Sequence, residues 1–587
     1  MAPTVRRTVS TQADNPRPDT GRVPLRPASE VMDLERLGSL HQCRLSFIRT
    51  IMRKVMAERW GIQRQRFDLD DNGYGTCIYR IASPTRIYNL VIFAQHLNPE
   101  DRSDRVIAQA WDLAFALCLG DVDDAYLEVL RENVPRQEAG RCDPRVLVLS
   151  RANRSLRNFD SMVEALASGQ QPDPDALARV GYLYRTTAVY GNGKFGIADY
   201  PRLRNSDDFG LPFSAQMFSV YLLRDFSIRQ VEHIARRRAP DTAVGLHPKL
   251  QRYLGIGNST GLGMAPFLIN HPQLINQWLL MRESALSRCL GEVPNEQTRQ
   301  QMIALIEHSI THNAETTTDD PRQAQANERL GEELAAARDW LLDTDTSEVM
   351  LWQALLNWSR EYASLETNEL LNSLLMELYP ERVDELEQTM AAAESQDLTP
   401  EMATDDLLAR LRRDYDWAIA YDFSDPEQTH LFWYRSAEKE EPRLGERGVD
   451  PGEENEMGLD IARQAHSLYQ ALTAWEAEQG RSTPLVEFLL AHPRFKGIAR
   501  RVQTLSEHAY GDIRANVLAR GTLPIHLLRC KLAFFGATKF DPRSDRWVRI
   551  TMFQGAPCIE DIGTHFADDW WMPLKPSAEE IAPCTSR

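Results

Sequence analysis

The sequence predicts a mixed α+β fold in which helices dominate. We expect an N-terminal unit with an antiparallel sheet, a helical middle, and a C-terminal helical unit with a few strands. β-Rich runs are concentrated between residues 62 and 170, whereas helical apolar spacing prevails from residue 175 onward. The chain of 587 residues is also too long for one core, because single cores stop growing near ~250–300 residues.

The first expected elements lie before residue 94. Residues 34–60 carry apolar side chains at helical spacing with basic residues between them, which predicts a helix. The turn signal Asp-Asp-Asn-Gly at residues 70–73 then precedes two β-rich runs, at residues 76–81 and 86–93, which we expect to be strands.

Residues 105–119 alternate between large and small side chains. Trp111 and Phe115 are among the large ones, and alanines and Cys118 lie between them, which predicts a strand whose small face accepts a closely packed helix or layer. A helix is the alternative, because alanine favours helices. The other expected elements of this unit are helices at residues 123–132 and 159–167 and a strand at residues 145–150.

Helical patterns prevail in the rest of the chain. A polar stretch with few aromatic residues, at residues 313–327, predicts a linker. Single helices are expected at residues 176–186, 213–238, 264–279, 297–312 and 405–417, and runs of several helices at residues 328–393 and 459–518. Short strands are expected at residues 429–435 and 546–553.

These patterns divide the chain into six expected segments. They are a disordered tail at residues 1–30, an α+β unit at 31–175, a helical unit with glycine-rich loops at 176–312, the linker at 313–327, a helical segment at 328–400, and a mainly helical C-terminal unit at 401–587 with a charged loop at 435–456. The tail is expected to be disordered because it is rich in Pro, Arg and Thr and has no apolar signal core.

Composition argues against several classes of partner. The formal charge of −17 and the pI near 5.4 argue against nucleic acid, which requires a basic surface. No run approaches the ~18 apolar residues of a membrane span, so we expect no membrane partner. The eight cysteines are scattered without a CxxC pair, which favours free thiols in a reducing cytoplasm over disulfides or a zinc site.

A glycine-rich stretch at residues 255–263 is the leading candidate for a ligand site. It lies directly before an expected helix, where glycines let backbone amides approach a ligand and the helix start favours an anion. It lacks the ending of a Walker A loop, and no expected strand precedes it, as a dinucleotide fingerprint or a nucleophile elbow requires. A flexible turn is the alternative. The candidate contacts are Gly257, Asn258, Ser259, Thr260, Gly261 and Gly263.

His247 and His271 are candidates for proton transfer. Each precedes a proline and a helical pattern, and proline suits the first position of a helix. Pro272 interrupts the helix expected after the glycine stretch, so that helix kinks or restarts there with His271 at the break. A histidine at such a break can face a ligand and titrate near neutrality, whereas a helix cap or a satisfied core histidine is the alternative.

Two further loops carry charged side chains that suit an anion. Residues 191–196 form a glycine turn in which Asn192 and Lys194 could meet a phosphate or a carboxylate. Residues 435–447 alternate arginines with glutamates, so Arg435, Arg443 and Arg447 could hold a carboxylate through bidentate hydrogen bonds while Glu438 acts as acid or base. An exposed salt-bridge loop is the alternative, since each exposed pair contributes only ~0–1 kcal/mol.

These features predict a cytoplasmic metabolic enzyme that binds a small carboxylate- or phosphate-bearing substrate and uses acid–base chemistry, as a lyase, an isomerase or a transferase. No motif identifies a cofactor or a metal, because His308 and His312 have helical spacing but lack a Glu-x-x-His frame. The alternative is a non-catalytic scaffold or regulatory protein that binds partners through helical faces. The sequence leaves a homo-oligomer open.

Overall fold

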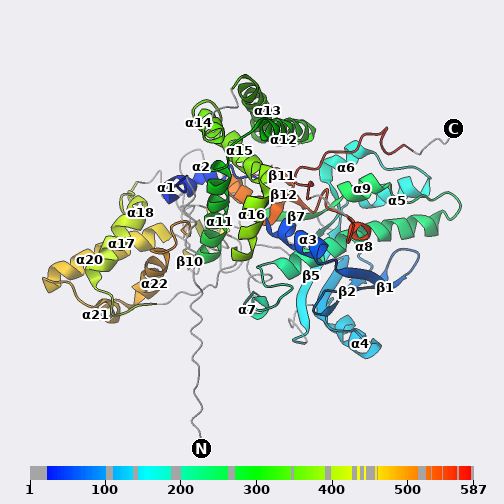
Figure 1. The fold of residues 1–587 in the computed structure, drawn as a ribbon. Coiled ribbons are helices and arrows are strands. Elements are labelled where there is room, and N and C mark those ends of the chain that lie inside the picture. The colour runs from blue at the N-terminus through cyan, green and yellow to red at the C-terminus, as the bar shows by residue number, and fades with distance from the viewer. Residues whose placement is uncertain are drawn as a thin grey trace, which may run out of the picture.

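The computed structural model of the chain describes most residues between 23 and 582 (Figure 1). The described ranges are 23–98, 100, 110–136, 143–186, 200–261, 271–344, 350–390, 398–425, 433–435, 442–444, 457–458, 461–512, 524–530, 532–544, 547–564 and 568–582. Within them the expected fold class is confirmed, because a large, mainly antiparallel sheet is combined with many helices.

A nine-stranded sheet has the order β1-β2-β3-β4-β5-β6-β7-β12-β11. Every neighbouring pair is antiparallel except β6 and β7, which are parallel. Its strands are β1 (Gly61–Leu69), β2 (Gly75–Ala82), β3 (Ile87–Ala94), β4 (Leu113–Leu119), β5 (Val146–Arg154), β6 (Tyr182–Thr186), β7 (Gly255–Gly261), β11 (Lys539–Ser544) and β12 (Trp547–Met552). A separate sheet of order β10-β8-β9 consists of β8 (Trp433–Arg435), β9 (Pro442–Leu444) and β10 (Met457–Gly458).

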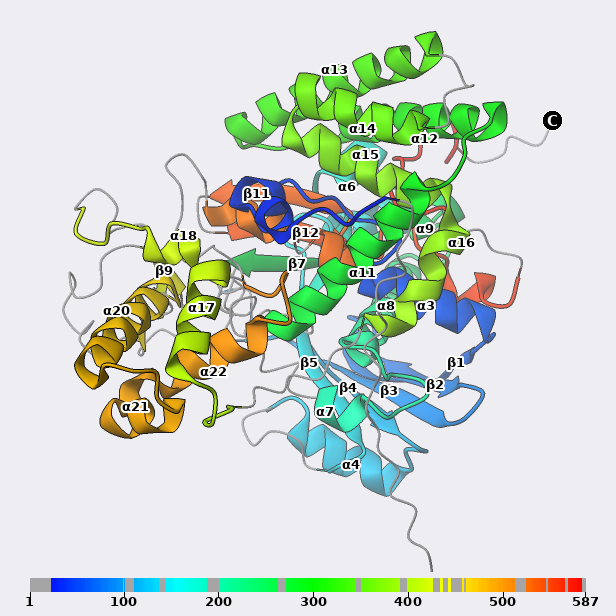
Figure 2. The same cartoon turned by 60° about the vertical axis from the view of Figure 1, so that its left-hand side comes forward.

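The last two strands of the large sheet come from the far end of the chain. β12 pairs with β7 so that Thr551 lies opposite Gly257, about 290 positions away. β11 then forms the outer edge beside β12. The sheet therefore joins segments from the N-terminal, middle and C-terminal parts of the chain, as the orange strands beside the green β7 show in Figure 2.

Most helices belong to one large hydrophobic core, and α4 (Asp124–Asn133) packs in a small cluster on the other face of the sheet. The longest, α8, packs against α3 and α5 and is buried over most of its length. The helices of this part are α1 (Ala28–Val31), α2 (Leu34–Leu37), α3 (Phe47–Ala57), α4 (Asp124–Asn133), α5 (Phe159–Ala167), α6 (Pro174–Val180), α7 (Tyr200–Leu203), α8 (Ser214–Arg238), α9 (Pro248–Tyr253), α11 (Pro272–Leu290), α12 (Glu296–Glu315), α13 (Pro321–Asp343), α14 (Leu351–Tyr362), α15 (Leu365–Leu378) and α16 (Pro380–Val383), with the short helical turns η3 (Asp384–Thr389), η7 (Pro524–Arg529), η8 (Leu532–Gly536) and η9 (Ile559–Asp561).

A second group of helices has a hydrophobic core of its own, to which Leu407, Phe488 and Val502 contribute. Figure 2 shows this group beside the large sheet. Its members are α17 (Thr404–Asp414), α18 (Asp416–Ile419), α20 (Ile461–Gln479), α21 (Leu485–Ala491), η5 (Pro493–Phe495) and α22 (Lys496–Leu505).

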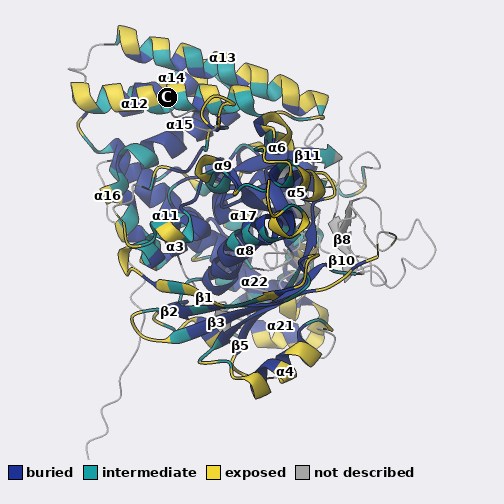
Figure 3. Cartoon of the chain, turned by 90° about the vertical axis from the view of Figure 1, so that its right-hand side faces the viewer, coloured by how far each residue is buried: buried dark blue, intermediate teal, exposed yellow. Residues whose placement is uncertain are grey.

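The helix α15 lies deep in the large core. Its residues 366–376 are all buried, although several of them are polar. Figure 3 shows that α12 and α13, which lie near it, carry exposed residues along their outer sides. Polar side chains on α15 therefore need partners inside the protein, because water does not reach them.

The alternation at residues 113–119 is confirmed as strand β4. Leu113 and Phe115 point into the large core, whereas Ala114 and Ala116 belong to a small cluster on the other face. α4 contributes to that cluster, so the small-residue face does receive a closely packed helix. The expected helices at residues 159–167 and 213–238 are likewise confirmed as α5 and α8.

Three expected elements in the first half of the chain are wrong in part. The helix expected at residues 176–186 ends at Val180, because Gly181 adopts a φ of 78° and the chain continues as β6. The helix expected at residues 34–60 is divided into α2 and α3. Residues 23–30 of the tail expected to be disordered are ordered, since Arg26 is buried and α1 begins at residue 28.

The expected linker at residues 313–327 is mostly helical. α12 continues to Glu315, and α13 begins at Pro321 with Asp320 as its N-cap. Both helices keep a buried stripe, which includes Ile306 and Leu330. A polar composition therefore marks the solvent-facing sides of two packed helices here, and not a linker.

The glycine-rich stretch expected to be a loop forms strand β7. A Cβ added at Gly257 would lie 2.5 Å from the ring of Tyr182 on the neighbouring strand, and one added at Gly255 would lie 2.4 Å from the carbonyl oxygen of Met552. Real Cβ atoms do not approach other atoms this closely, so glycine is required for strand packing.

We predict that Gly257→Ala destabilises the protein by about 1–3 kcal/mol, because the added methyl group overlaps the Tyr182 ring. The free energy of unfolding in urea measures this. Gly497→Ala is the control, since nothing lies within 4 Å of a Cβ there, and alanine in a helix gains up to ~1 kcal/mol over glycine. Equal stability of wild type and Gly257→Ala contradicts the packing role.

Candidate functional site

The two histidines expected to transfer protons begin helices. His247 is the N-cap of α9, and its Nδ1 accepts a hydrogen bond from the backbone N–H of Lys249 at 3.3 Å. His271 is the N-cap of α11, so the expected restart of the helix at Pro272 is confirmed. Burial lowers the pKa of His271 to about 4, so the expectation that it titrates near neutrality is wrong.

The candidate anion contacts at Gly257, Asn258, Ser259, Thr260 and Gly261 lie on a strand and not in a loop at a helix start. The ladder with β12 uses backbone amides that an anion pocket would need. Asn258 is buried and donates through Nδ2 to the carbonyl oxygen of Thr186 at 2.8 Å. Strand packing therefore accounts for the described part of this stretch.

The other candidate residues are only partly described. Arg435 and Arg443 lie on β8 and β9, where Tyr434 is paired with Arg443. The residues 436–441 between these strands lie outside the described part. Asn192, Lys194, Gly263, Glu438 and Arg447 also lie outside it, so the described residues do not bring the three candidate loops together.

A groove with two arginines lies at the start of α15, and we name it the arginine groove. Its volume is about 440 Å3. α1, α2, α14 and α15 supply its walls, so the N-terminal segment and the middle of the chain meet there. The lining residues are Glu30, Arg36, Ser359, Arg360, Ala363, Ser364, Leu365 and Asn368.

Helix caps fix the directions of the groove walls. Asp33 accepts hydrogen bonds from the backbone N–H groups of Glu35 and Arg36, at 3.0 and 3.2 Å, and so starts α2. Ser364 is the N-cap of α15 and donates its hydroxyl to Glu333 of α13 at 2.6 Å. These caps place Arg36 and the first turn of α15 beside each other.

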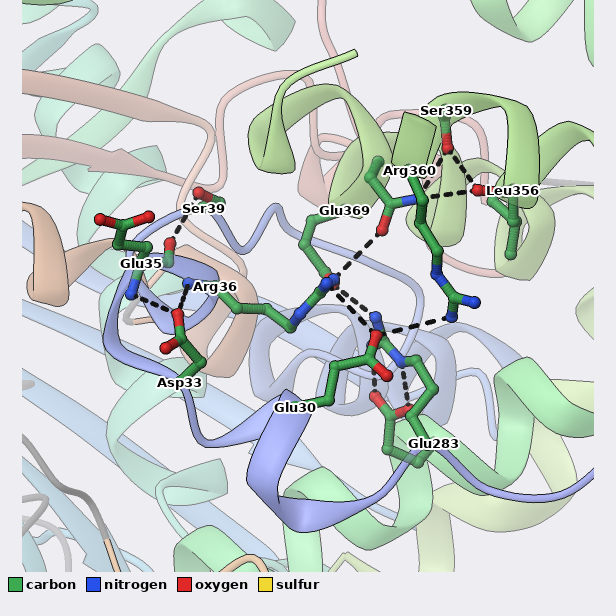
Figure 4. Close-up of polar contacts among 12 residues, drawn as sticks. Glu30, Asp33, Glu35, Arg36, Ser39, Glu283, Leu356, Ser359, Arg360 and Glu369 are labelled. Atoms are coloured by element: carbon green, nitrogen blue, oxygen red, sulfur yellow. Dashed lines mark hydrogen bonds and ion pairs between the residues drawn. The ribbon is translucent and has the colours of Figure 1, made fainter. Parts of the chain in front are cut away.

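A buried network of charges lies beneath the groove (Figure 4). Arg26 and Arg36 each donate to Oε1 of Glu369 at 2.6 Å. Arg282 donates to the other oxygen of Glu369 at 2.7 Å. Arg26 also forms a bidentate pair with Glu283, with both distances 2.7 Å. Three guanidinium groups therefore face two carboxylates, which leaves one excess positive charge below the groove.

The network keeps its charges at neutral pH. Burial opposes ionisation of Glu369, yet Arg26, Arg282 and Arg36 hold the pKa of this carboxyl group well below its usual range. Burial also disfavours the charge of Arg26, but Glu283 and Glu369 raise the pKa of its guanidinium group well above the usual value. Each charge thus depends on its partners, because an unpaired buried charge is costly.

Glu30 bridges the two arginines of the groove (Figure 4). Its Oε1 lies 3.2 Å from Nη2 of Arg36 and 3.5 Å from Nη2 of Arg360. The side chains of Glu30 and Arg360 are 30% and 38% exposed, whereas that of Arg36 is 8% exposed. Asn368 accepts from Arg36 at 3.1 Å and donates to Ser359 at 2.6 Å. The groove thus already holds one carboxylate between two guanidinium groups.

Sequence reasoning missed all residues of this groove. Glu369 is separated from Arg26 by 343 positions and from Arg36 by 333, so no local motif connects them. One signal was available: Glu369 lies beside Leu370 and Leu371 in a leucine-rich helical pattern, and an ionisable group that such a helix buries needs a partner. That signal points to a buried polar contact but does not name its partners.

Comparisons with family models, with curated proteins and with solved structures give no match for this chain. The described helices include none that is long and apolar enough to cross a membrane. Among the described residues, no group of three or more His, Cys, Asp or Glu side chains is arranged to hold a metal ion.

We predict that Glu369→Gln lowers the free energy of unfolding by about 3–5 kcal/mol at pH 7, because buried guanidinium groups lose their counter-charge. The depressed pKa of Glu369 also makes the wild type lose stability as the pH falls below about 4.5, and the variant should show a weaker fall. Urea unfolding at several pH values measures both effects.

Glu128→Gln is the control for this substitution, since Glu128 forms an exposed pair with Arg131 at 3.3 Å. Such pairs contribute about 0.3–0.5 kcal/mol. If the two variants lose similar stability, the buried network does not hold α15 as described.

Proposed function

We propose that the chain binds a small carboxylate- or phosphate-bearing metabolite in the arginine groove. The position of the Glu30 carboxylate between Arg36 and Arg360 supports this most directly, because guanidinium groups arranged around one carboxylate can hold another. The excess positive charge of the buried network favours an anion at the same place.

We assign to Glu30 the acid–base role in a lyase, isomerase or transferase reaction on the bound metabolite. Among the described lining residues, it is the one carboxylic acid. An anion that takes its place between the arginines leaves the carboxylate free beside the ligand, within reach for proton transfer. The competing proposal is a non-catalytic scaffold, which requires no small molecule in the groove.

A cytoplasmic location is part of the same proposal. The described cysteines Cys43, Cys77, Cys118, Cys289, Cys530 and Cys558 form no disulfide. Free thiols of this kind are usual in the reducing cytoplasm, where disulfides are rare.

We predict opposite effects from two substitutions at the groove. Glu30→Gln should raise the affinity for phosphate or a small carboxylate about fivefold or more, because it removes the carboxylate that competes for Arg36 and Arg360. Arg360→Ala should lower the affinity about tenfold or more, since a charge-assisted hydrogen bond contributes ~1.5–3 kcal/mol. Isothermal titration with phosphate and with a panel of small carboxylates measures both.

Arg413→Ala is the matched control, because Arg413 is an exposed arginine paired with Asp414 at 2.8 Å on the second group of helices. Its affinity for the anions should equal that of the wild type. Binding that is unchanged in both groove variants, or absent from the wild type, rejects the groove as the site and favours the scaffold.

A further inference from the structure

A second hollow, which we name the polar cavity, lies on another side of α15. Its volume is about 70 Å3, and its walls come from the segment after α2 and from α12, α13, α15, η7 and β11. The side chains that matter for its chemistry are His41, His312, Gln323, Asn327, Glu366 and Arg529. None of them lines the arginine groove.

Arg529 and Glu366 form a pair of opposite charges on the wall of the polar cavity. Nη2 of Arg529 lies 2.5 Å from Oε1 of Glu366, and Nε2 of His41 lies 3.6 Å from the same oxygen. Burial opposes the charge of Glu366, but Arg529 and His41 hold the pKa of its carboxyl group well below the usual range. Arg529 and Glu366 are therefore paired with each other and together add no net charge to this part of the wall.

The two histidines of the cavity are neutral at physiological pH. Burial lowers the pKa of His41, and the charge of Arg529 lowers it further. Burial lowers the pKa of His312 to about 4, and its Nδ1 donates to the carbonyl oxygen of Pro573 at 3.1 Å. Neither imidazole adds a charge to the wall.

Lys539 also lines the cavity, and backbone carbonyl oxygens hold its ammonium group. Its Nζ donates to the carbonyl oxygens of Ala178 and Arg179 at the end of α6, both at 2.9 Å. The neighbouring Phe540 places its ring 5.0 Å from the guanidinium carbon of Arg529. Successive side chains of a strand point to opposite faces, so the side chain of Lys539 points away from the side on which Arg529 lies.

Four buried polar atoms of the wall have no hydrogen bond to the described residues, and two of them, Oε1 of Glu366 and Nε2 of His41, belong to the ion pairs of the wall. The other two, which we call the orphan atoms, are the acceptor Oε1 of Gln323 and the donor Nε of Arg529, on side chains that are 2% and 5% exposed. The other end of the Gln323 amide is satisfied, because Nε2 donates to Asn327 at 2.7 Å. Buried polar groups in folded proteins are nearly always paired, so a partner that fills the cavity has to both donate and accept.

We propose that the polar cavity binds a small uncharged molecule that both donates and accepts hydrogen bonds, of the class of a primary amide. The cavity volume of about 70 Å3 exceeds the ~10–15 Å3 that one water molecule needs, which suits a molecule of a few non-hydrogen atoms. An anion would meet Glu366 and a cation would meet Arg529, whereas an apolar molecule would leave both orphan atoms unpaired.

Neutral His41 fits the same class of ligand. Its ring offers a donor or an acceptor according to the tautomer, and its Nε2 lies just beyond hydrogen-bond distance of Glu366. The proposal is independent of the arginine groove, because it rests on different side chains and on the opposite requirement for ligand charge.

The test uses acetamide and acetate, which match in size and shape but differ in charge. On the full chain, saturation-transfer NMR titrations should give acetamide a dissociation constant in the millimolar range or tighter, as befits so small a ligand. Gln323→Met, of similar volume, should weaken acetamide binding at least tenfold and leave acetate binding unchanged. Arg529→Lys, which keeps the charge beside Glu366 but removes Nε, should also weaken acetamide at least tenfold.

Gln353→Met is the matched control, since Gln353 donates to Asn357 at 3.1 Å in the same i,i+4 arrangement as Gln323 and Asn327, but on α14 and away from the cavity. Circular dichroism establishes that each variant is folded, and Arg529→Lys carries the test if Gln323→Met does not fold.

The proposal is overturned if the wild type does not bind acetamide, because water alone then occupies the cavity. It is also overturned if both cavity variants still bind acetamide, or if both variants lose the binding of acetate together with that of acetamide. Arg360→Ala distinguishes the two sites. This substitution should weaken the binding of acetate and leave the binding of acetamide unchanged. If the arginine groove does not bind anions, the acetamide result still stands, and if the polar cavity does not bind acetamide, the acetate result still stands.

Discussion

The carboxylate of Glu369 is shared by guanidinium groups from three separate parts of the chain. Arg26 belongs to the N-terminal segment, Arg36 to α2 and Arg282 to α11. Because this carboxylate is fully buried, its charge is compensated only when all three segments are docked on α15. The groove and the polar cavity both depend on that docking, since the segment from residue 30 to residue 41 supplies a wall to each.

Buried arginines join distant segments elsewhere in the molecule as well. Arg224 of α8 donates to five backbone carbonyl oxygens, three at the end of α9 and two in the C-terminal part, at Ala556 and Pro557. Arg49 of α3 pairs with Glu377 at 2.5 Å and with Asp568 at 3.1 Å. These contacts hold the strand that follows α9 and the last described segment against the same core.

The spacing of apolar residues predicted those helices and strands whose own sequence is sufficient to specify them. The helices α5 and α8 and the strand β4 have clear apolar patterns and form as expected. β6 was missed because a single left-handed residue, Gly181, ends the preceding helix. β7 was missed because glycine and asparagine are uncommon in strands, and only its partners β6 and β12 make this stretch extended.

The candidate site was harder to predict than the fold. Sequence reasoning looked for anion contacts in loops that share a short motif, whereas the arginine groove is assembled from side chains hundreds of positions apart. The chemistry it expected, arginine forks beside a glutamate, recurs in the groove with Arg36, Arg360 and Glu30. Residue types can therefore suggest a chemistry, but the tertiary fold determines which arginines and glutamates come into contact.

The pairing of β7 with β12 sets an order of events during synthesis. At about 5–20 residues per second, the roughly 290 residues between the two strands take about 15–60 s to emerge from the ribosome. Throughout this interval, β7 lacks one of its neighbours, and an unpaired strand edge invites association with other chains. Glycine and asparagine have low strand propensity, so β7 is a poor template for aggregation before β12 is synthesised. Gly257, which fits beside Tyr182, is one of these residues.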